Sequence, residues 1–553
     1  MSRQRVIAIC LDAFDVEFSN AMIERGLLPG LAKCRDVAAR FKLQHGDRNT
    51  ARDSGLTGEH VATGLSPETT GRWSPLLFDT ETYTVRQKFT QEVPYFAQIG
   101  AKCVVLDATY FDLKKAPNCQ GLVGWSGHDP GILPYARPEG LRNEVDDMFG
   151  DPVDTELLNQ NVYSDTESVR LFSAAVEKAA RQRTDVAKWL LTERFQDWDV
   201  ALIAFSEGHD GIEQLYHGVA PDHHLSSIDS AQAAKDGLEA IYTAISEGIE
   251  TLMETLPDAT FAVFTMHGMG ENQTDIPSML LLPELMYRLE FGRPYFRSRK
   301  DWADASAAQL AKGEDWTTAI TNAQNHPIPH YLAKLPGKLA GKVRRKSQRL
   351  LSKVGLCDAP DINLAEDEFD VDWIPAIKYR EYWPKMQAFG MPGLFDGRVR
   401  VNLKNRERQG IVERHDYHRL LDNLEATLKA CRDPKTGEPV VAHIDRPGEQ
   451  DPFALNESQS DLHVTWKGNP LAFSHPDLGV IGPAPLRRVG GHTGQFGALY
   501  LIGKDIPDGD YGIRSSFDIA PTIVDLVGAV QPNRLDGKSV LQAMFGPDLM
   551  PSM

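Results

Sequence analysis

Cysteine is scarce in this chain. Six cysteines stand among 553 residues, at positions 10, 34, 103, 119, 357 and 431, and none forms a CxxC pair. This scatter supports neither a disulfide framework nor a cysteine metal site. No apolar run reaches the roughly 18–20 uninterrupted residues of a membrane-spanning helix. Basic residues are outnumbered, with 59 Lys and Arg against 77 Asp and Glu, a net charge of −18. Since nucleic-acid phosphates require a basic face, we expect neither nucleic acid nor a membrane as partner.

The remaining composition is that of a globular chain, with 42% apolar and 25% charged residues. Its length allows about three domains, or one large α/β domain with insertions. The chain opens on MSRQRVIAICLDAFD, where the apolar run Val6–Leu11 is too short for a signal peptide and lacks a small-residue cleavage site. We therefore expect a cytoplasmic protein whose first core strand is Val6–Leu11. The sequence leaves the oligomeric state open.

Short β-branched runs alternate with longer amphipathic stretches. Helical patterns lie near 166–193, 227–255, 416–431 and 517–528. Strands bounded by helices of this length predict an α/β fold with a mostly parallel central sheet, sandwiched by helices on both faces. The expected strands are Val6–Leu11, Cys103–Asp107, Val200–Phe205, Phe261–Thr265, Val440–Ile444, His463–Trp466 and Ala498–Ile502.

One region departs from this alternation. Between about 285 and 385 the strand signals disappear, and Lys and Arg without any acid fill the part from Lys334 to Lys353. The pattern fits a solvated basic helix face, and it also fits a cap that attracts an anionic substrate or partner. We therefore divide the chain into a catalytic core of 1–284 and 386–553 and an inserted basic helical cap of 285–385.

Metal-ligand residues follow the predicted strands. Asp12 comes directly after the first strand, SEGHDGIEQLYH follows Val200–Phe205, and His267 follows Phe261–Thr265. His492 stands in a Gly-rich turn before the last strand. In an open α/β sheet, ligands bind outside the carboxyl ends of the strands, so these side chains are candidates for one site.

The SEGHDGIEQLYH segment has helical spacing. His209, Glu213 and His217 stand at i, i+4 and i+8, and neighbouring pairs would lie about 6 Å apart on one helix face. One such pair with a distant ligand suits Zn²⁺ or a similar ion. His217 would lie about 12 Å along the axis from His209, too far to share the ion, which leaves a supporting, substrate-facing or structural role. Asp210 is an alternate ligand if the helix begins one residue later.

A second constellation runs from Arg52 to Gly64. Ser54 precedes a short helical pattern that stops at Gly64, and free backbone N–H groups surround a hydroxyl at a helix N-terminus. One interpretation is a serine that caps the helix. The other is a nucleophile that attacks an anionic group held by those N–H groups, activated by a base or metal with Asp12 and His267 as partners.

These segments together resemble the alkaline phosphatase superfamily, in its type I phosphodiesterase/nucleotide pyrophosphatase branch. LDAFD resembles the first-strand aspartate motif, and SGLTGEHVATGLSPETTG resembles the nucleophile loop, in which Ser or Thr lies ten residues before the Gly of a TG-x-x-P turn. GGHTG is similar to the late histidine motif and FDIAPTIVDLVG to the closing helix. GWSGHDP and DGRVRVNLKNRERQGIV look like segments of bacterial members.

The resemblance implies two divalent metals, often Zn²⁺, bound by residues at matching positions. One site would use His209, Glu213 and His492, with the family's Asp and His exchanged at 209 and 213. The other would use Asp12, Ser54 and His267. The family has an Asp at the position of Met266, and a thioether is a poor ligand for a hard ion. Whether the protein binds one ion or two is therefore left open. Thr57 stands where the family has a phosphate-contacting Asn.

The resemblance thus implies a metal-dependent phosphoric ester hydrolase that acts on a small anionic metabolite through a Ser54 intermediate. Phosphodiesterase or phosphomonoesterase activity and Zn²⁺, with Mn²⁺ as second choice, are the first expectations. Because the ligands are altered, two alternatives stay open: a member repurposed for phosphoryl or sulfuryl transfer or another biosynthetic reaction, and a degenerate protein that binds without turnover. His128 and Asp129, in a polar loop after Trp125, are candidates to reach the substrate.

Overall fold

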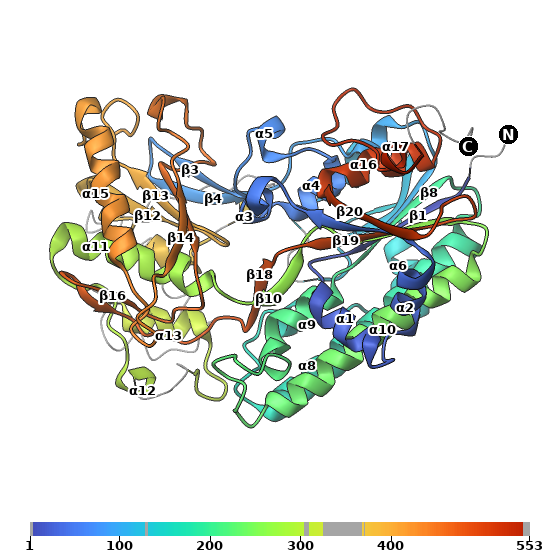
Figure 1. The fold of residues 1–553 in the computed structure, drawn as a ribbon, viewed down its shortest axis with the longest axis horizontal. Coiled ribbons are helices and arrows are strands. Elements are labelled where there is room, and N and C mark those ends of the chain that lie inside the picture. The colour runs from blue at the N-terminus through green and yellow to red at the C-terminus, as the bar shows by residue number, and fades with distance from the viewer. Residues whose placement is uncertain (1–3, 128–130, 304–308, 325–367, 370, 546–553) are drawn as a thin grey trace.

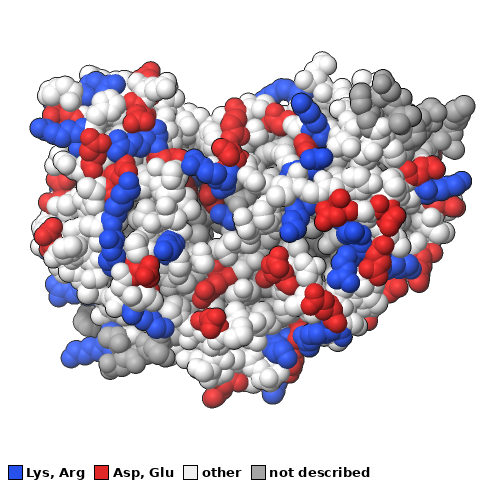
Figure 2. Space-filling model, in the orientation of Figure 1, with Lys and Arg blue, Asp and Glu red and all other residues white. Residues whose placement is uncertain are grey.

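The computed structural model describes residues 4–127, 131–303, 309–324, 368–369 and 371–545. Two lobes stand side by side, with the longest helices and the larger sheet in one of them (Figure 1). On the face drawn in Figure 2, acidic and basic side chains are interspersed over both lobes. No helix in the described part of the chain is both long and apolar enough to span a membrane.

A nine-stranded mixed sheet organises the larger lobe. Its centre is parallel: β1 pairs with β8 and β9, and β5 pairs with β8 and β6. β19 runs antiparallel between β9 and β2, and β7 runs antiparallel to β6. The predicted mostly parallel sheet is confirmed. The order is β20 (Gly509–Ser515), β2 (Ala39–Gln44), β19 (Gly497–Ile502), β9 (Thr260–Thr265), β1 (Val6–Leu11), β8 (Val200–Phe205), β5 (Cys103–Leu106), β6 (Cys119–Val123) and β7 (Tyr135–Arg137).

Helices cover both faces of this sheet, because alternate residues of its strands are apolar on each side. In β1, Ile7 and Ile9 pack against one helical layer, whereas Val6 and Ala8 pack into the other. The first layer holds α1 (Val16–Glu24), α2 (Pro29–Val37), α6 (Leu141–Phe149), α8 (Thr166–Trp189), α9 (Glu207–Leu215) and α10 (Ala231–Thr255), and the second holds α4 (Thr57–Thr63), α16 (Ile519–Leu526) and α17 (Leu541–Phe545) (Figure 1).

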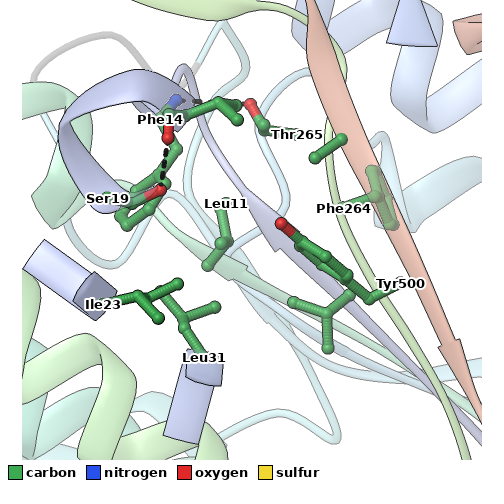
Figure 3. Close-up of a pocket in the computed structure, with 11 residues that line it drawn as sticks. Leu11, Phe14, Ser19, Ile23, Leu31, Phe264, Thr265 and Tyr500 are labelled. Carbon is green, nitrogen blue, oxygen red and sulfur yellow. Dashed lines mark hydrogen bonds between the residues drawn. The ribbon is translucent and has the colours of Figure 1, made fainter. Parts of the chain in front are cut away.

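The start of the chain is fixed tightly to this sheet (Figure 3). Asp15 caps α1 by accepting from the Phe18 N–H, and Phe14 N donates to Thr265 Oγ1 of β9 at 3.3 Å. A small cavity beside them is lined mostly by apolar side chains, among them Leu11 and Tyr500. The loop that carries Asp12 is therefore supported by tightly packed side chains of the hydrophobic core.

The smaller lobe has its own antiparallel sheet and hydrophobic core. Val440–Ile444 and His463–Trp466, predicted as strands of the central sheet, lie here as β14 (Val441–Asp445) and β15 (Leu462–Trp466). That assignment to the central sheet was wrong, because their inward residues pack on α11 (Leu282–Phe291), not on α8 or α10. β12 (Ala388–Met391), β13 (Gly397–Val401), α13 (Trp316–Ala323) and α15 (Tyr417–Ala430) complete the lobe.

Buried side chains from 285–303, 309–324 and 371–385 belong to this same core. Trp316 and Trp383 are buried in one cluster with Val399 and Val464 of the small sheet. The basic residues 334–353 lie outside the described residues, and the proposed boundaries of the cap stay a prediction. The two lobes are connected by β10 (Gly268–Glu271) and β18 (Gly490–Gly494), which pair antiparallel between them (Figure 1).

Candidate metal centre

The five predicted ligand residues meet at the carboxyl ends of the central strands. Asp12 follows β1, His267 follows β9, and α9 starts two residues after β8. The last ligand, His492, comes from β18, which pairs with the strand after His267. Parallel neighbours end at the same sheet edge, so the order of β9, β1 and β8 brings together residues far apart in sequence.

Three of these side chains converge closely enough to bind one metal ion. His209 Nε2 lies 3.1 Å from His492 Nε2 and 3.4 Å from Glu213 Oε1. One donor atom from each of the three residues lies within 4.8 Å of the others. Two imidazole nitrogens and a carboxylate oxygen form a donor set that suits Zn²⁺ or a similar divalent ion. The residues present therefore fit one ion.

Asp12 and His267 flank this triad. Asp12 Oδ2 lies 3.5 Å from His209 Nδ1, and His267 Nε2 lies 3.4 Å from His492 Nδ1. The Gly268 carbonyl accepts from His267 Nδ1 at 2.9 Å, so the proton of the neutral ring lies on Nδ1 and the Nε2 lone pair is directed at the cluster. Burial, with help from the nearby Arg52 charge, lowers the pKa of His267 to about 4. The imidazole is therefore neutral at pH 7.

A buried ion-pair network holds the start of α9. Arg183, which is fully buried on α8, donates to Glu207 Oε1 at 2.7 Å and to Asp107 Oδ2 at 3.0 Å. Glu207 is the first residue of α9, so the network fixes the helix two residues before His209. Asp210 is buried beside it, and burial raises the pKa of its carboxyl to about 6. Asp210 does not belong to the group of converging donor atoms found in the described residues.

His217 does not join the cluster. α9 ends at Leu215, and His217 lies in the following short turn, where its Nε2 is 3.2 Å from Ser230 Oγ. Ser230 precedes α10, so this contact indicates a structural role for His217. It agrees with the expectation that His217 lies too far from His209 to share a metal ion. His128 and Asp129 lie outside the described residues. Met266 is 4% exposed and packs with apolar side chains of the core.

Ser54 lies in the turn between α3 (Thr50–Asp53) and α4. α4 begins at Thr57 with Leu56 as its N-cap, so the interpretation of Ser54 as the capping residue was wrong. The helix ends at Gly64, as predicted, and Gly64 has the left-handed conformation. Ser54 Oγ donates to the Ala51 carbonyl at 2.6 Å and accepts from Leu56 N at 3.3 Å. Thr57, the first residue of α4, is half-buried.

Two contacts place this turn beside the strand that carries His492. Arg52 Nη1 donates to the Gly494 carbonyl at 3.4 Å. A Cβ at Gly55 would lie 2.5 Å from the ring of Phe395, and that ring stands edge-on to His492 with centroids 4.7 Å apart. Ser54 and the candidate metal ligands are thus connected through β18 and Phe395.

A cleft of about 470 Å³ between the lobes is lined by Ser54 on one side and by the small sheet on the other. His463 of β15 is in register with Arg398 of β13 and Asp445 of β14, which makes a polar row across three strands. Arg398 is already bonded to Asp396 Oδ1 at 2.8 Å. The other lining residues are Asp47, Thr50, Asp53, Glu68, Trp73, Arg446, Pro447, Gln459 and Thr465.

Sequence reasoning missed three side chains around the site. Arg488 contacts Glu213 Oε2, Phe395 packs on His492, and Arg52 reaches β18. Arg488 stands only four residues before His492, and a basic residue that close to a ligand motif was the available signal. Nothing in the sequence indicates the partners of Phe395 or Arg52, because both contacts join segments far apart along the chain.

No family model matches the chain, and no curated protein matches it. Among solved structures, phosphonoacetate hydrolase from Sinorhizobium meliloti 1021 aligns at 15% identity over 96% of each chain, with a TM-score of 0.45. Murine ectonucleotide pyrophosphatase/phosphodiesterase 5 aligns at 9% identity over 97% of each chain, with a TM-score of 0.43. Its human counterpart aligns at 8% identity over 97% of each chain, with a TM-score of 0.41. These neighbours belong to the alkaline phosphatase superfamily.

Proposed function

We propose that the protein is a metal-dependent hydrolase of phosphate esters, with phosphodiesters as first choice and phosphomonoesters as second. The observation that carries the proposal is the convergence of His209, Glu213 and His492 at the carboxyl edge of the sheet. Two imidazole nitrogens and one carboxylate oxygen favour Zn²⁺, with Mn²⁺ as second choice. When bound, such an ion polarises a phosphoryl oxygen and stabilises the charge that develops on it.

We assign the nucleophile to Ser54. Its oxygen forms a bond to phosphorus, the P–O bond to the alcohol breaks, and the alcohol leaves with a proton. Water then cleaves the seryl phosphate and restores the hydroxyl. The Ser54 hydroxyl first has to leave the Ala51 carbonyl that it now contacts at 2.6 Å. Asp12 and His267 are the proposed acceptors of its proton, because a carboxylate and a neutral imidazole can each serve as a general base, and the imidazole of His267 is neutral at pH 7.

Thr57 and the backbone of its helix are the proposed contacts of the phosphoryl oxygens. Thr57 is the first residue of α4, where backbone N–H groups lack partners within the helix and the dipole favours an anion. A threonine hydroxyl adds one donor to these amides. This arrangement supports a negatively charged group bound next to Ser54.

We place the alcohol portion of the substrate in the cleft between the lobes, because Ser54 lines it. Carboxylates outnumber cationic groups on its walls, and Arg398 is already paired with Asp396. A second phosphate there would meet repulsion. The substrate that fits best therefore carries its negative charge on the single phosphate that reacts.

The decisive experiment compares wild-type protein with Ser54→Ala on nitrophenyl esters. Protein loaded with Zn²⁺ or Mn²⁺ is assayed with nitrophenyl phosphate, bis(nitrophenyl) phosphate and nitrophenyl sulfate, and metal content is measured on the same samples. We expect turnover of a phosphate ester by the wild type and a loss of about a thousandfold or more in Ser54→Ala, at unchanged metal content.

Each other outcome has a defined meaning. Full turnover by Ser54→Ala would remove the covalent intermediate from the proposal. A preference for the sulfate would favour sulfuryl chemistry. A wild-type protein that binds metal but cleaves none of the esters would favour a repurposed member, and one that binds neither metal nor ester would favour a degenerate binding protein.

A further inference from the structure

Arg488 and Glu213 form a buried ion pair at the edge of the metal centre. Arg488 Nη1 contacts Glu213 Oε2, and each side chain is only 8% exposed. A carboxylate or guanidinium left alone in such surroundings is strongly disfavoured, so each charge depends on the other. Glu213 is the only one of the three converging residues that carries a negative charge, and Arg488 offsets it.

The two oxygens of Glu213 have different neighbours. Oε2 faces the guanidinium, whereas Oε1 lies 3.4 Å from His209 Nε2, on the side of the converging donors. A carboxylate free to rotate could present either oxygen or both to an ion. The contact with Arg488 restricts Glu213 to one orientation, in which a single oxygen is offered.

The backbone reinforces this orientation. Val489 N donates to the Glu213 carbonyl at 2.8 Å, directly after Arg488. At the next residue, Gly490, a Cβ would lie 2.1 Å from the Ile212 carbonyl, so only glycine permits the approach of β18 to α9. Arg488 and His492 therefore come from one segment whose distance from α9 is fixed.

From this geometry we infer that Arg488 is a positioning residue of the metal centre, an assignment that rests on the proposed metal dependence. It holds Glu213 as a one-oxygen ligand and offsets its charge, so that the site presents two imidazole nitrogens and one carboxylate oxygen. Such a donor set favours Zn²⁺ over Mg²⁺ or Ca²⁺, because the hard ions require more oxygen ligands.

The test measures the binding of Zn²⁺ alone to the full-length protein, by competition with a chromophoric chelator. Arg488→Met removes the guanidinium, and we expect the affinity to fall about 10–100-fold, the usual cost of losing the partner of a metal ligand. Arg488→Lys keeps the charge but not the planar fork, so its loss should be smaller. Arg487→Met is the matched control, because Arg487 pairs with Asp275 and packs over Trp373 instead.

The outcomes separate this inference from the proposed function. If the wild type binds neither Zn²⁺ nor Mn²⁺, the metal centre is refuted, and the role of Arg488 with it. If the wild type binds Zn²⁺ and Arg488→Met binds it as tightly or more tightly, only the role of Arg488 is refuted. Circular dichroism checks folding. If Arg488→Met does not fold, Arg488→Lys decides: severalfold weaker binding supports the inference, and wild-type affinity overturns it.

Discussion

The Nε2 atoms of His209 and His492 lie 3.1 Å apart, although 283 positions separate the two residues in the sequence. Glu213 Oε1 is 3.4 Å from the same nitrogen of His209. A hydrogen bond between the two imidazoles needs one proton, which only one of the two nitrogens can carry. A divalent cation, in contrast, would accept the lone pairs of both nitrogens and of the carboxylate oxygen. The contact between these two histidines therefore brings β18 next to α9, the helix that follows β8.

Removal of His492 should abolish tight metal binding. We expect His492→Ala to weaken Zn²⁺ binding by more than the roughly 10–100-fold that the loss of an outer partner costs, since a direct donor disappears. Competition with a chelator measures the change. His443→Ala is the control, because His443 is 47% exposed and pairs only with Asp445 among the residues described. Equal affinities for the two variants would contradict the proposed site.

Acid should destabilise the protein through His217. Burial, and to a lesser degree the neighbouring His223, lowers the pKa of His217 to about 3. In the unfolded chain a histidine has a pKa of about 6.5, so its stabilising contribution is complete above that pH and is lost as the pH falls toward 3. We expect His217→Leu to flatten the decrease in melting temperature between pH 7 and pH 4.

The control for this pH effect is again a histidine at the surface. His443→Leu should leave the slope of melting temperature against pH unchanged. Burial also lowers the pKa of His60 to about 3, so the stability of the His217→Leu variant still depends on pH. The substitution should therefore reduce the slope of melting temperature against pH without removing it. Parallel curves for wild type and His217→Leu would show that His217 does not contribute.

Gly490 should be sensitive to the smallest substitution. In Gly490→Ala the added Cβ meets the Ile212 carbonyl at 2.1 Å, and backbone on both sides prevents easy relief. We expect a loss of roughly 1–3 kcal/mol in the free energy of unfolding, together with weaker Zn²⁺ binding as β18 moves away from α9. Denaturant unfolding and chelator titration measure the two effects.

Gly512→Ala separates this clash from the general effect of replacing glycine. Gly512 has a φ of +78° and an added Cβ would meet nothing within 4 Å, so only backbone strain of about 1–2 kcal/mol is expected. Its Zn²⁺ affinity should equal that of the wild type. If Gly490→Ala also leaves metal binding unchanged, the close approach of β18 does not control the site.

Local pattern predicted much of the larger lobe. Val6–Leu11 and Val200–Phe205 are strands with the expected bounds, because continuous apolar runs of that length are typical of buried parallel strands. The strands β14 and β15 were also found, but their sheet was not. The apolar pattern of a strand indicates that the strand is buried, but it does not indicate which other strand it pairs with. Pairing depends on contacts between segments that are distant in the sequence.

The candidate ligands were also found from sequence, since Asp12, His209, Glu213 and His267 follow predicted strands and helical spacing joins two of them. The role of Ser54 stays a prediction, although the structure removes its alternative as a helix cap. The cleft could not be predicted, because its two walls come from different lobes whose relative placement no local pattern encodes.

The sequence by itself determined the periodicity of the strands and helices and the chemical types of the candidate ligands that follow the predicted strands. Only the tertiary structure decided which oxygen of Glu213 faces the site, because that choice depends on Arg488, hundreds of residues away. It also decided that His217 contacts Ser230 and not the candidate metal ligands. Spacing along the chain constrains neighbours within one helix, whereas convergence between segments depends on how their apolar faces pack.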